Sequence, residues 1–469
     1  LRAERSGVKT GITLSVKHYM LRILFFTSVL FIARPSFPDT GGWAATYGGA
    51  GEDWAAAIRQ TGDGGYIVAG WTASFSTVNG DLWVLKLRAD GAVEWQKAYG
   101  GASSDFAASI QQTGDGGYIV AGETRSFGVG EADMWVLKLK PNGTVEWQKT
   151  YGGTASDKAA SIQQTHDRGY VVAGMTQSFG AGDYDAWILK LTPDGSIEWQ
   201  KTYGGGGMDA AHSIRQTGDG GYIVAGCTSS FGTGRGDFWV LKLRPDGTLE
   251  WQKTYGGDDS DEAHSIQQTR DGGYIVAGTT SSFGAGEGDL WVLKLKSDGI
   301  VKWQTTCGGD CVDGAVSIQE TGDEGYIVAG VKDELPAGGG DLWVLKIRSE
   351  GSVKWQKVYG GAGWEWATSI QQTTEGGYIV AGLTSSFGTG GFDSWVLKLR
   401  PDGSIHPSCG FVWNIIAPET GSNAAILDTS ASIKDSYINP QDSSAMILDT
   451  DVSAEVQCPA APYYYGKPL

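Results

Sequence analysis

The sequence predicts an all-β fold: a seven-bladed β-propeller of four-stranded antiparallel blades, closed by the N-terminal strand and followed by a small C-terminal β-rich appendage. Three observations predict this fold class. A repeat of 52 residues occurs seven times without insertion, each copy contains four strand-like runs, and the array opens with a strand that the last copy lacks. The propeller is expected over residues 41–405.

Two tryptophan ladders and one isoleucine ladder define the repeat. In each ladder the same residue type returns every 52 positions. The members are Trp83, Trp135, Trp187, Trp239, Trp291, Trp343 and Trp395; Ile58, Ile110, Ile162, Ile214, Ile266, Ile318 and Ile370; and Trp43, Trp95, Trp147, Trp199, Trp251, Trp303 and Trp355. Three ladders in constant register indicate one structural unit copied seven times.

Each copy reads as four short strands joined by tight turns. In the second copy the strands are AASIQQT, GYIVAGET, MWVLKLK and TVEWQKTYGG, which are rich in β-branched and aromatic residues. The linking sequences TGDGGY and PNGT contain Gly and Asn, which tolerate the positive φ of tight turns. Four such strands form one antiparallel blade.

The two ends of the array predict how the ring closes. WAATYGG, residues 43–49, is an extra copy of the fourth strand, and the seventh copy ends at LKLRPDGSIHPSCG without that strand. The N-terminal strand is therefore expected to complete the last blade, which leaves no gap in the ring. An open solenoid is the alternative, and the missing strand argues against it.

The flanking segments carry separate expectations. Residues 1–40 are interpreted as an upstream segment and a secretory signal, because Met20–Ala33 joins one basic residue to a short apolar run. A retained membrane anchor is the alternative, and no later segment is apolar enough to cross a membrane. The expected location is extracellular or at the cell surface. Residues 406–469 are expected to form a β-rich tail or stalk.

The net charge excludes one class of partner, and the cysteines suggest where disulfides could form. The net charge of −17 argues against nucleic acid, because phosphate binding needs a basic face. Export would permit disulfides. Cys409 and Cys458 bracket the tail and are candidates to staple it, Cys307 and Cys311 are close enough to pair across a loop, and Cys227 is left over.

The repeat resembles a known family. The pattern YGG…D…SIQQT.DGGYIVAG.T.SFG.G..D.WVLKL..DG…WQK is similar to the prokaryotic secreted β-propeller-repeat proteins, which are kelch-like in their GGY-strand-G rhythm, over residues 43–405. The turn Thr61–Gly65 also resembles the Asp-box of sialidases, which in that family is a structural hairpin. The resemblance implies the fold strongly and function weakly, because propellers serve as enzymes, lectins and scaffolds.

Two polar ladders are predicted to be structural. Each copy has an Asp two residues before the strand-three Trp, Asp81 in the first copy, and a Lys within the apolar WVLKL strand, Lys86 in the first copy. A Lys in such a strand needs a partner or a route to water. An Asp–Lys tie within or between blades would explain both ladders.

A ring of carboxylates is the candidate metal site. It precedes the presumed inner strand and is expected to crown the central channel, where carboxylate oxygens would suit Ca²⁺, and no other cofactor is expected. The alternative, favoured by the sevenfold repetition, is turn capping or hydrogen bonding to backbone amides. The ring consists of Asp53, Asp105, Asp157, Asp209, Asp261, Asp313 and Glu365.

A smaller metal hypothesis concerns two histidines. His212 and His264 occupy equivalent positions in neighbouring copies, three residues after ring carboxylates Asp209 and Asp261. Two His and two Asp would suit a transition metal, although solvated or packed histidines are the commoner outcome. The sequence contains no Gly-x-Ser-x-Gly, HExxH or phosphate-cradling loop.

Comparison of the seven copies predicts one constant face and one variable face. The turns TGDGG and xDG hardly vary, and both lie on the face called here the turn face. The other two loops vary strongly and lie on the opposite face, the loop face, which is the candidate binding face. Aromatic residues gather on it where the first and last copies meet: Trp54, Trp71, Phe106, Trp364, Trp366 and Phe392. The alternative is that these rings fill gaps between blades.

Three functions follow from these patterns. The favoured one is a monomeric, non-enzymatic binding or scaffold propeller that recognises glycan or protein through the loop face, since flat aromatics suit sugar rings and protein hot spots. The second is a carbohydrate-active hydrolase or lyase with acidic residues near the channel mouth. The third is a structural component of a surface assembly.

Overall fold

The fold is a seven-bladed β-propeller, as predicted, in a computed structural model of the chain. The structure describes residues 41–76, 79–333, 339–406, 409–414, 419–420, 425–428, 432–435, 441–442, 446–449 and 455–458. The predicted signal segment lies outside these residues. The described part of the chain contains no helix with the length and hydropathy that a membrane-spanning segment needs.

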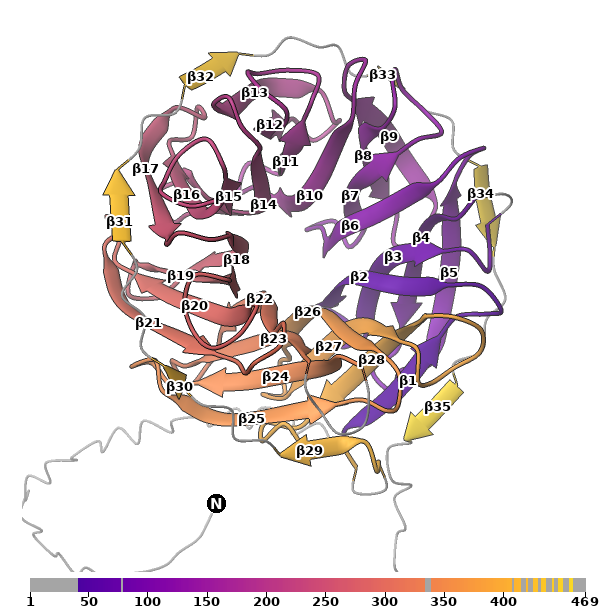
Figure 1. The fold of residues 1–469 in the computed structure, drawn as a ribbon. Coiled ribbons are helices and arrows are strands. Elements are labelled where there is room, and N and C mark those ends of the chain that lie inside the picture. The colour runs from indigo at the N-terminus through magenta and orange to yellow at the C-terminus, as the bar shows by residue number, and fades with distance from the viewer. Residues whose placement is uncertain are drawn as a thin grey trace, which may run out of the picture. The chain divides into compact units, whose positions relative to one another are not determined.

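Each repeat forms one antiparallel blade whose first strand lines the centre of the ring (Figure 1). Blade 1 contains β2 (Asp53–Gln60), β3 (Tyr66–Thr72), β4 (Asp81–Leu87) and β5 (Val93–Gly100); blade 2 contains β6 (Asp105–Gln112), β7 (Tyr118–Thr124), β8 (Asp133–Leu139) and β9 (Val145–Tyr151); blade 3 contains β10 (Asp157–Gln164), β11 (Tyr170–Thr176), β12 (Asp185–Leu191) and β13 (Ile197–Gly204); blade 4 contains β14 (Asp209–Gln216), β15 (Tyr222–Thr228), β16 (Asp237–Leu243) and β17 (Leu249–Gly256). Blade 5 contains β18 (Asp261–Gln268), β19 (Tyr274–Thr280), β20 (Asp289–Leu295) and β21 (Val301–Cys307); blade 6 contains β22 (Gly314–Glu320), β23 (Tyr326–Lys332), β24 (Asp341–Ile347) and β25 (Val353–Tyr359); blade 7 contains β26 (Glu365–Gln372), β27 (Tyr378–Thr384), β28 (Asp393–Leu399) and β1 (Trp43–Tyr47).

The ring closes through its N-terminal strand, as predicted. β1 pairs with β28 over five residues, from Trp43 opposite Lys398 to Tyr47 opposite Ser394. Two segments at opposite ends of the propeller sequence thus share one blade. This pairing satisfies the backbone groups that an unclosed last blade would leave exposed.

The hydrophobic core lies between neighbouring blades. Alternate residues of the middle strands point to opposite faces of a blade, and both faces are covered, so the strands are almost continuously apolar. Trp135 of blade 2, for example, packs with Leu82 and Val84 of blade 1 and has no exposed surface. The Trp95 ring also meets the Tyr118 ring edge-on, with centroids 5.9 Å apart.

The described C-terminal strands add a fifth strand to every blade. They pair with the outer strand of each blade and run round the ring in reverse order, from blade 6 to blade 1 and then blade 7 (Figure 1). They are β29 (Val412–Asn414), β30 (Glu419–Thr420), β31 (Ala425–Asp428), β32 (Ser432–Asp435), β33 (Gln441–Asp442), β34 (Met446–Asp449) and β35 (Glu455–Cys458). The sequence predicted a β-rich tail or stalk here. The described residues are indeed strands, and they cover the edges that four-stranded blades would expose.

The cysteines correct one prediction. Cys307 and Cys311 are not joined by a disulfide, so the predicted bond between them is wrong. Cys307 occupies the position that a tyrosine holds near the end of the fourth strand in the other blades. Its side chain is buried in the core between blades 5 and 6. Cys409 is disulfide-bonded. Its predicted partner, Cys458, has a side chain outside the described residues.

Candidate functional site

The ring carboxylates are buried hydrogen-bond acceptors at the loop-face end of each inner strand. Asp157 has no exposed surface and accepts hydrogen bonds from the Thr176 hydroxyl, from Ser178 Oγ at 2.6 Å and from the Gly153 amide at 2.8 Å. Burial contradicts the prediction that these groups crown the channel. Because donors already occupy both oxygens, the residues fit a hydrogen-bonded hub better than a Ca²⁺ site, and calcium binding stays a prediction.

The Asp ladder of the third strand lies beside these hubs. Asp133 Oδ1 and Asp157 Oδ2 both crowd the Cα of Gly152, so that a Cβ at this position would meet both carboxylates. Burial, and then the charge of Asp157, raises the pKa of Asp133 to about 7. The equivalent glycine of every blade is crowded by the same two positions, so two buried carboxyl groups lie side by side at each blade junction.

The predicted Asp–Lys tie is wrong. Lys190 Nζ lies 2.8 Å from Asp167 Oδ2, in the turn between strands one and two, and the described lysines of this ladder all bond to that turn carboxylate. Asp185 and Lys190 lie five residues apart on β12, so their side chains leave opposite faces of the strand. The lysine ladder thus braces the turn face.

The channel wall near the loop face is formed by three positions of each blade. Two lie on the first strand, as Trp54 and Ala56 do in blade 1, and the third lies on the second strand, as Trp71 does. A register shift between Ala55 and Ala57 marks a β-bulge in the first strand, which leaves Trp54 and Ala56 half-buried and their neighbours buried. Residue types at these positions differ from blade to blade.

Three of the predicted aromatic residues form a stacked row across blades 1 and 2. Trp54 and Trp71 are cross-strand partners with ring centroids 4.6 Å apart, and Trp71 stacks on Phe106 at 5.7 Å with an interplanar angle of 10°. All three are half-buried. The row therefore partly fills the space between two blades, which was the alternative interpretation.

The remaining predicted aromatics belong to blade 7 and its flanking loops. Trp364 and Trp366 are 48% and 46% exposed, which makes them the only aromatic side chains among the exposed large apolar residues of the described chain. Phe392 is half-buried, and its carbonyl accepts the Asp53 amide at 2.7 Å. The open aromatic surface is thus narrower than the sequence predicted.

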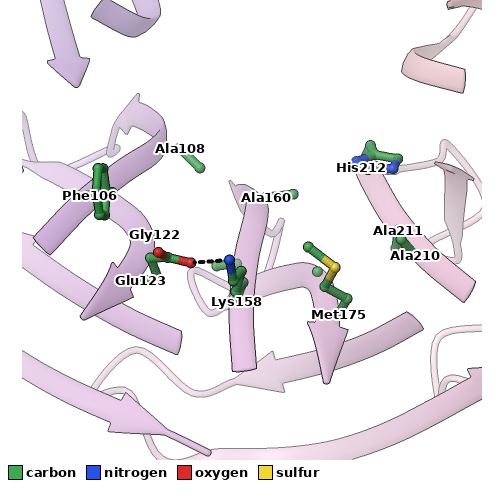
Figure 2. Close-up of a pocket in the computed structure, with 12 residues that line it drawn as sticks. Phe106, Ala108, Gly122, Glu123, Lys158, Ala160, Met175, Ala210, Ala211 and His212 are labelled. Atoms are coloured by element: carbon green, nitrogen blue, oxygen red, sulfur yellow. Dashed lines mark ion pairs between the residues drawn. The ribbon is translucent and has the colours of Figure 1, made fainter. Parts of the chain in front are cut away.

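An apolar cavity that the sequence did not predict lies next to the aromatic row. It measures about 230 Å³ and spans blades 2, 3 and 4. Figure 2 shows Phe106 and His212 on opposite sides, with Met175 and the Glu123–Lys158 ion pair between them; that pair is 3.1 Å apart. The sequence did carry one sign of this cavity: the residue types at the lining positions differ from one repeat to the next.

The two candidate histidines do meet, but with other partners. Their rings are 5.7 Å apart, His212 Nε2 lies 3.0 Å from Glu262 Oε1, and Cys227 Sγ lies 3.7 Å from the same nitrogen. Asp209 and Asp261, the predicted ligands, are instead fully buried in their hubs. The predicted set of two His and two Asp is therefore wrong.

Comparisons with known proteins identify neither a family nor a function for this chain. No protein-family model and no curated protein matches the chain, so the family resemblance stays a prediction. Similar solved structures include Sqt1 from Chaetomium thermophilum (11% identity, TM-score 0.42, covering 80% of this chain and 89% of that one), the WD40 β-propeller domain of Doa1 (11%, 0.46, 76% and 97%) and a protein of unknown function from Dyadobacter fermentans DSM 18053 (13%, 0.42, 78% and 100%). At these identities and TM-scores, the similarity carries no argument about function.

Proposed function

We propose that the chain is a non-enzymatic binding module that holds a glycan at the loop-face mouth of its channel. The observation that carries this proposal is the pair of exposed indoles, Trp364 and Trp366, at blade 7. Trp366 is the second residue of β26, and Trp364 lies in the loop directly before that strand, so the blade helps to hold both side chains in place. Large exposed aromatic side chains on a rigid frame are typical of binding sites.

The shape of the neighbouring surface favours sugar rings. The row of Trp54, Trp71 and Phe106 continues round the mouth with nearly parallel rings, at 26° and 10° to one another. These three rings stack face to face, so an open indole face for the apolar side of a pyranose comes from the exposed Trp364 and Trp366, and the row forms an apolar border beside them. Export to the cell surface or medium belongs to the same proposal and rests on the apolar segment Met20–Ala33.

The perturbed carboxyl groups support binding over catalysis. A raised pKa commonly marks a general acid in an open cleft. Here the raised pKa values belong to groups such as Asp133 and Asp341, which are 2% and 0% exposed inside the blade packing. A substrate cannot reach them without the blades separating.

The test is a glycan array probed with the labelled full chain, followed by titration of any ligand found. We expect Trp364→Ala and Trp366→Ala to weaken binding by at least about 10-fold each, equivalent to about 1.4 kcal/mol. Ile300→Ala is the matched control, because Ile300 is 44% exposed but lies in a turn-face loop.

Two results would contradict the proposal. Equal glycan binding by the double tryptophan variant would remove the site, and binding to proteins with none to glycans would replace the ligand class. Release of sugar from polysaccharides by the wild-type chain would favour the hydrolase or lyase alternative.

A further inference from the structure

We propose that His212, Cys227 and Glu262 bind a Zn²⁺ ion in the channel wall where blades 4 and 5 meet. His212 belongs to β14, Cys227 to β15 and Glu262 to β18. An imidazole nitrogen, a thiolate and a carboxylate are all established Zn²⁺ ligands. The proposal is independent of the glycan site, which lies on blades 7, 1 and 2.

The spacing of the three ligand atoms fits a tetrahedral ion. Bonds of about 2.3 Å to sulfur and about 2.0–2.1 Å to nitrogen or oxygen place tetrahedral ligand atoms roughly 3.3–3.6 Å apart. His212 Nε2 lies 3.7 Å from Cys227 Sγ and 3.0 Å from Glu262 Oε1, and the three atoms all lie within 4.8 Å of one another. The separation between Cys227 Sγ and the Glu262 carboxylate is at most 4.8 Å, so all three atoms lie close enough for side-chain rotation to bring them round one ion.

The backbone explains why these residues converge. Cys227 pairs across the blade with Ala210, and the bulge between Ala211 and Ser213 accompanies a half-buried His212 on the channel side of β14. Glu262 comes from the equivalent first strand of the next blade. The ligands are therefore held by two adjacent sheets rather than by mobile loops.

The propeller itself does not need these residue types. The positions equivalent to Cys227 hold Trp71, Glu123, Met175, Thr279, Val331 and Leu383, and those equivalent to Glu262 hold Trp54, Phe106, Lys158, Ala210, Gly314 and Trp366. Six blades form with unrelated residues at these positions, so the fold of the repeat does not require a Cys and a Glu beside His212.

The chemistry of the three ligands suits a cation. A thiolate from Cys227 and a carboxylate from Glu262 would supply negative charge, and His212 would supply a neutral nitrogen donor. Binding of the ion would release the thiol proton.

The neighbouring cavity gives the ion access to the channel. His212 lines the 230 Å³ cavity opposite Phe106 (Figure 2). Three protein ligands leave one tetrahedral position for water or another small ligand, which would enter from this side. His264 packs edge-on against His212 and restricts the rotation of that ring.

The experiment is metal titration of the full chain, kept reduced after removal of metal with a chelator. We expect one Zn²⁺ per chain by calorimetry, a rise in Tm on adding Zn²⁺, and a thiolate-to-cobalt charge-transfer band when Co²⁺ is used instead. Cys227→Ser should abolish the charge-transfer band, and Cys227→Ser or His212→Ala should weaken Zn²⁺ binding at least 10-fold.

The matched control is the double variant His166→Ala and Cys311→Ser, which removes an exposed imidazole and a cysteine without a disulfide, both outside the cluster. It should bind Zn²⁺ like the wild-type chain. Circular dichroism and the metal-free Tm check that each variant folds. Absence of stoichiometric binding, or unchanged binding by the folded Cys227→Ser variant, would show that the cluster is only a hydrogen-bonded contact and would overturn the proposal.

Discussion

Near the turn face the channel wall carries five glutamines and two arginines, whereas near the loop face its residue types change from blade to blade. The glutamine carbonyl oxygens tie neighbouring blades together: Gln163 Oε1, for example, accepts the backbone amide of Gln216 in the next blade at 2.7 Å. The same tie joins four other blade pairs. Near the loop face the channel-lining side chains differ between blades, so no hydrogen bond of theirs recurs in all seven blades.

The difference shows what a repeat must keep and what it can vary. A side chain that holds two blades together stays constant, and one that only faces the channel is free to take on binding roles. Blade 6 and the two arginine positions are the informative exceptions. In blade 6 a lysine replaces the threonine that donates to the hub carboxylate, and at the two arginine positions the glutamine that joins neighbouring blades is missing.

Blade 6 offers the largest expected effect. Its hub carboxylate, Asp313, is fully buried and pairs with Lys332 Nζ at 2.5 Å, where other blades have a threonine hydroxyl. Lys332→Met would leave this carboxylate without its counter-charge, and we expect a loss of about 3–5 kcal/mol in the free energy of unfolding, measured by urea denaturation.

Lys332→Thr is the matched variant for that prediction. It restores the residue that donates to the hub in the other six blades, Thr176 in blade 3 for example. We expect it to recover most of the lost stability. Equal destabilisation by both substitutions would mean that the cost arises from packing against Trp343, which the lysine also overlies, rather than from the charge.

The carboxyl pairs between blades predict a pH dependence. Burial, and then the charge of Glu365, raises the pKa of Asp341 to about 7 from an ordinary value of 3.8. A group whose pKa is higher in the folded state contributes stability that is complete below pH 3.8 and is lost as the pH rises through about 7. His264, with a lowered pKa of about 4, acts in the opposite direction between pH 4 and 6.5.

Asp341→Asn isolates the carboxyl contribution. The amide mimics the protonated acid and does not titrate, so the stability of this variant relative to wild type should rise by about 2–4 kcal/mol between pH 5 and pH 8. Urea denaturation of both proteins across this range measures the difference. A constant difference would show that Asp341 is already ionised in the folded state.

The arginine positions predict a smaller, stabilising change. Arg59 and Arg215 replace glutamines, have no acceptor for the tie, and bond only to the Ser369 and Ser161 hydroxyls and to backbone carbonyls. Burial, followed by repulsion from Arg215, lowers the pKa of Arg59 to about 10. Arg215→Gln should therefore raise the free energy of unfolding by about 1 kcal/mol, because a tie to the Gln268 amide can form and a half-buried charge is removed.

The reverse substitution checks the same reasoning. Gln163→Arg breaks an existing tie and adds a third charge to the wall, so it should lower Tm where Arg215→Gln raises it. If both variants unfold like the wild-type chain, the glutamine ties contribute nothing measurable and the constancy of the turn face has another cause.

Much of the fold followed from the ladders, and the errors share one cause. The closing strand was predictable because WAATYGG is visibly a fourth strand without a blade. The Asp–Lys tie and the set of two His and two Asp were wrong because they assumed that residues close in sequence share a face. On a strand the alternation of side chains and a single bulge decide which residues face each other.

The candidate site was predictable in part. Trp54 and Trp71 were placed on one face, and their stacking follows from the register of β2 and β3. The cavity and the His212–Cys227–Glu262 cluster were not foreseen, because both depend on contacts between blades. The cavity spans blades 2, 3 and 4, and the cluster joins two strands of blade 4 with one strand of blade 5.

The number of blades, their strand order and the closing strand followed from the order of residues along the chain, because a constant period repeats the same local propensities and the same turns. Which side chains meet across blades became visible only in the folded ring. Those contacts depend on strand register, on the bulge in each inner strand and on the curvature of the ring. The same physical reason separates the braced turn face from the loop face, where Trp364, Trp366 and the His–Cys–Glu cluster lie.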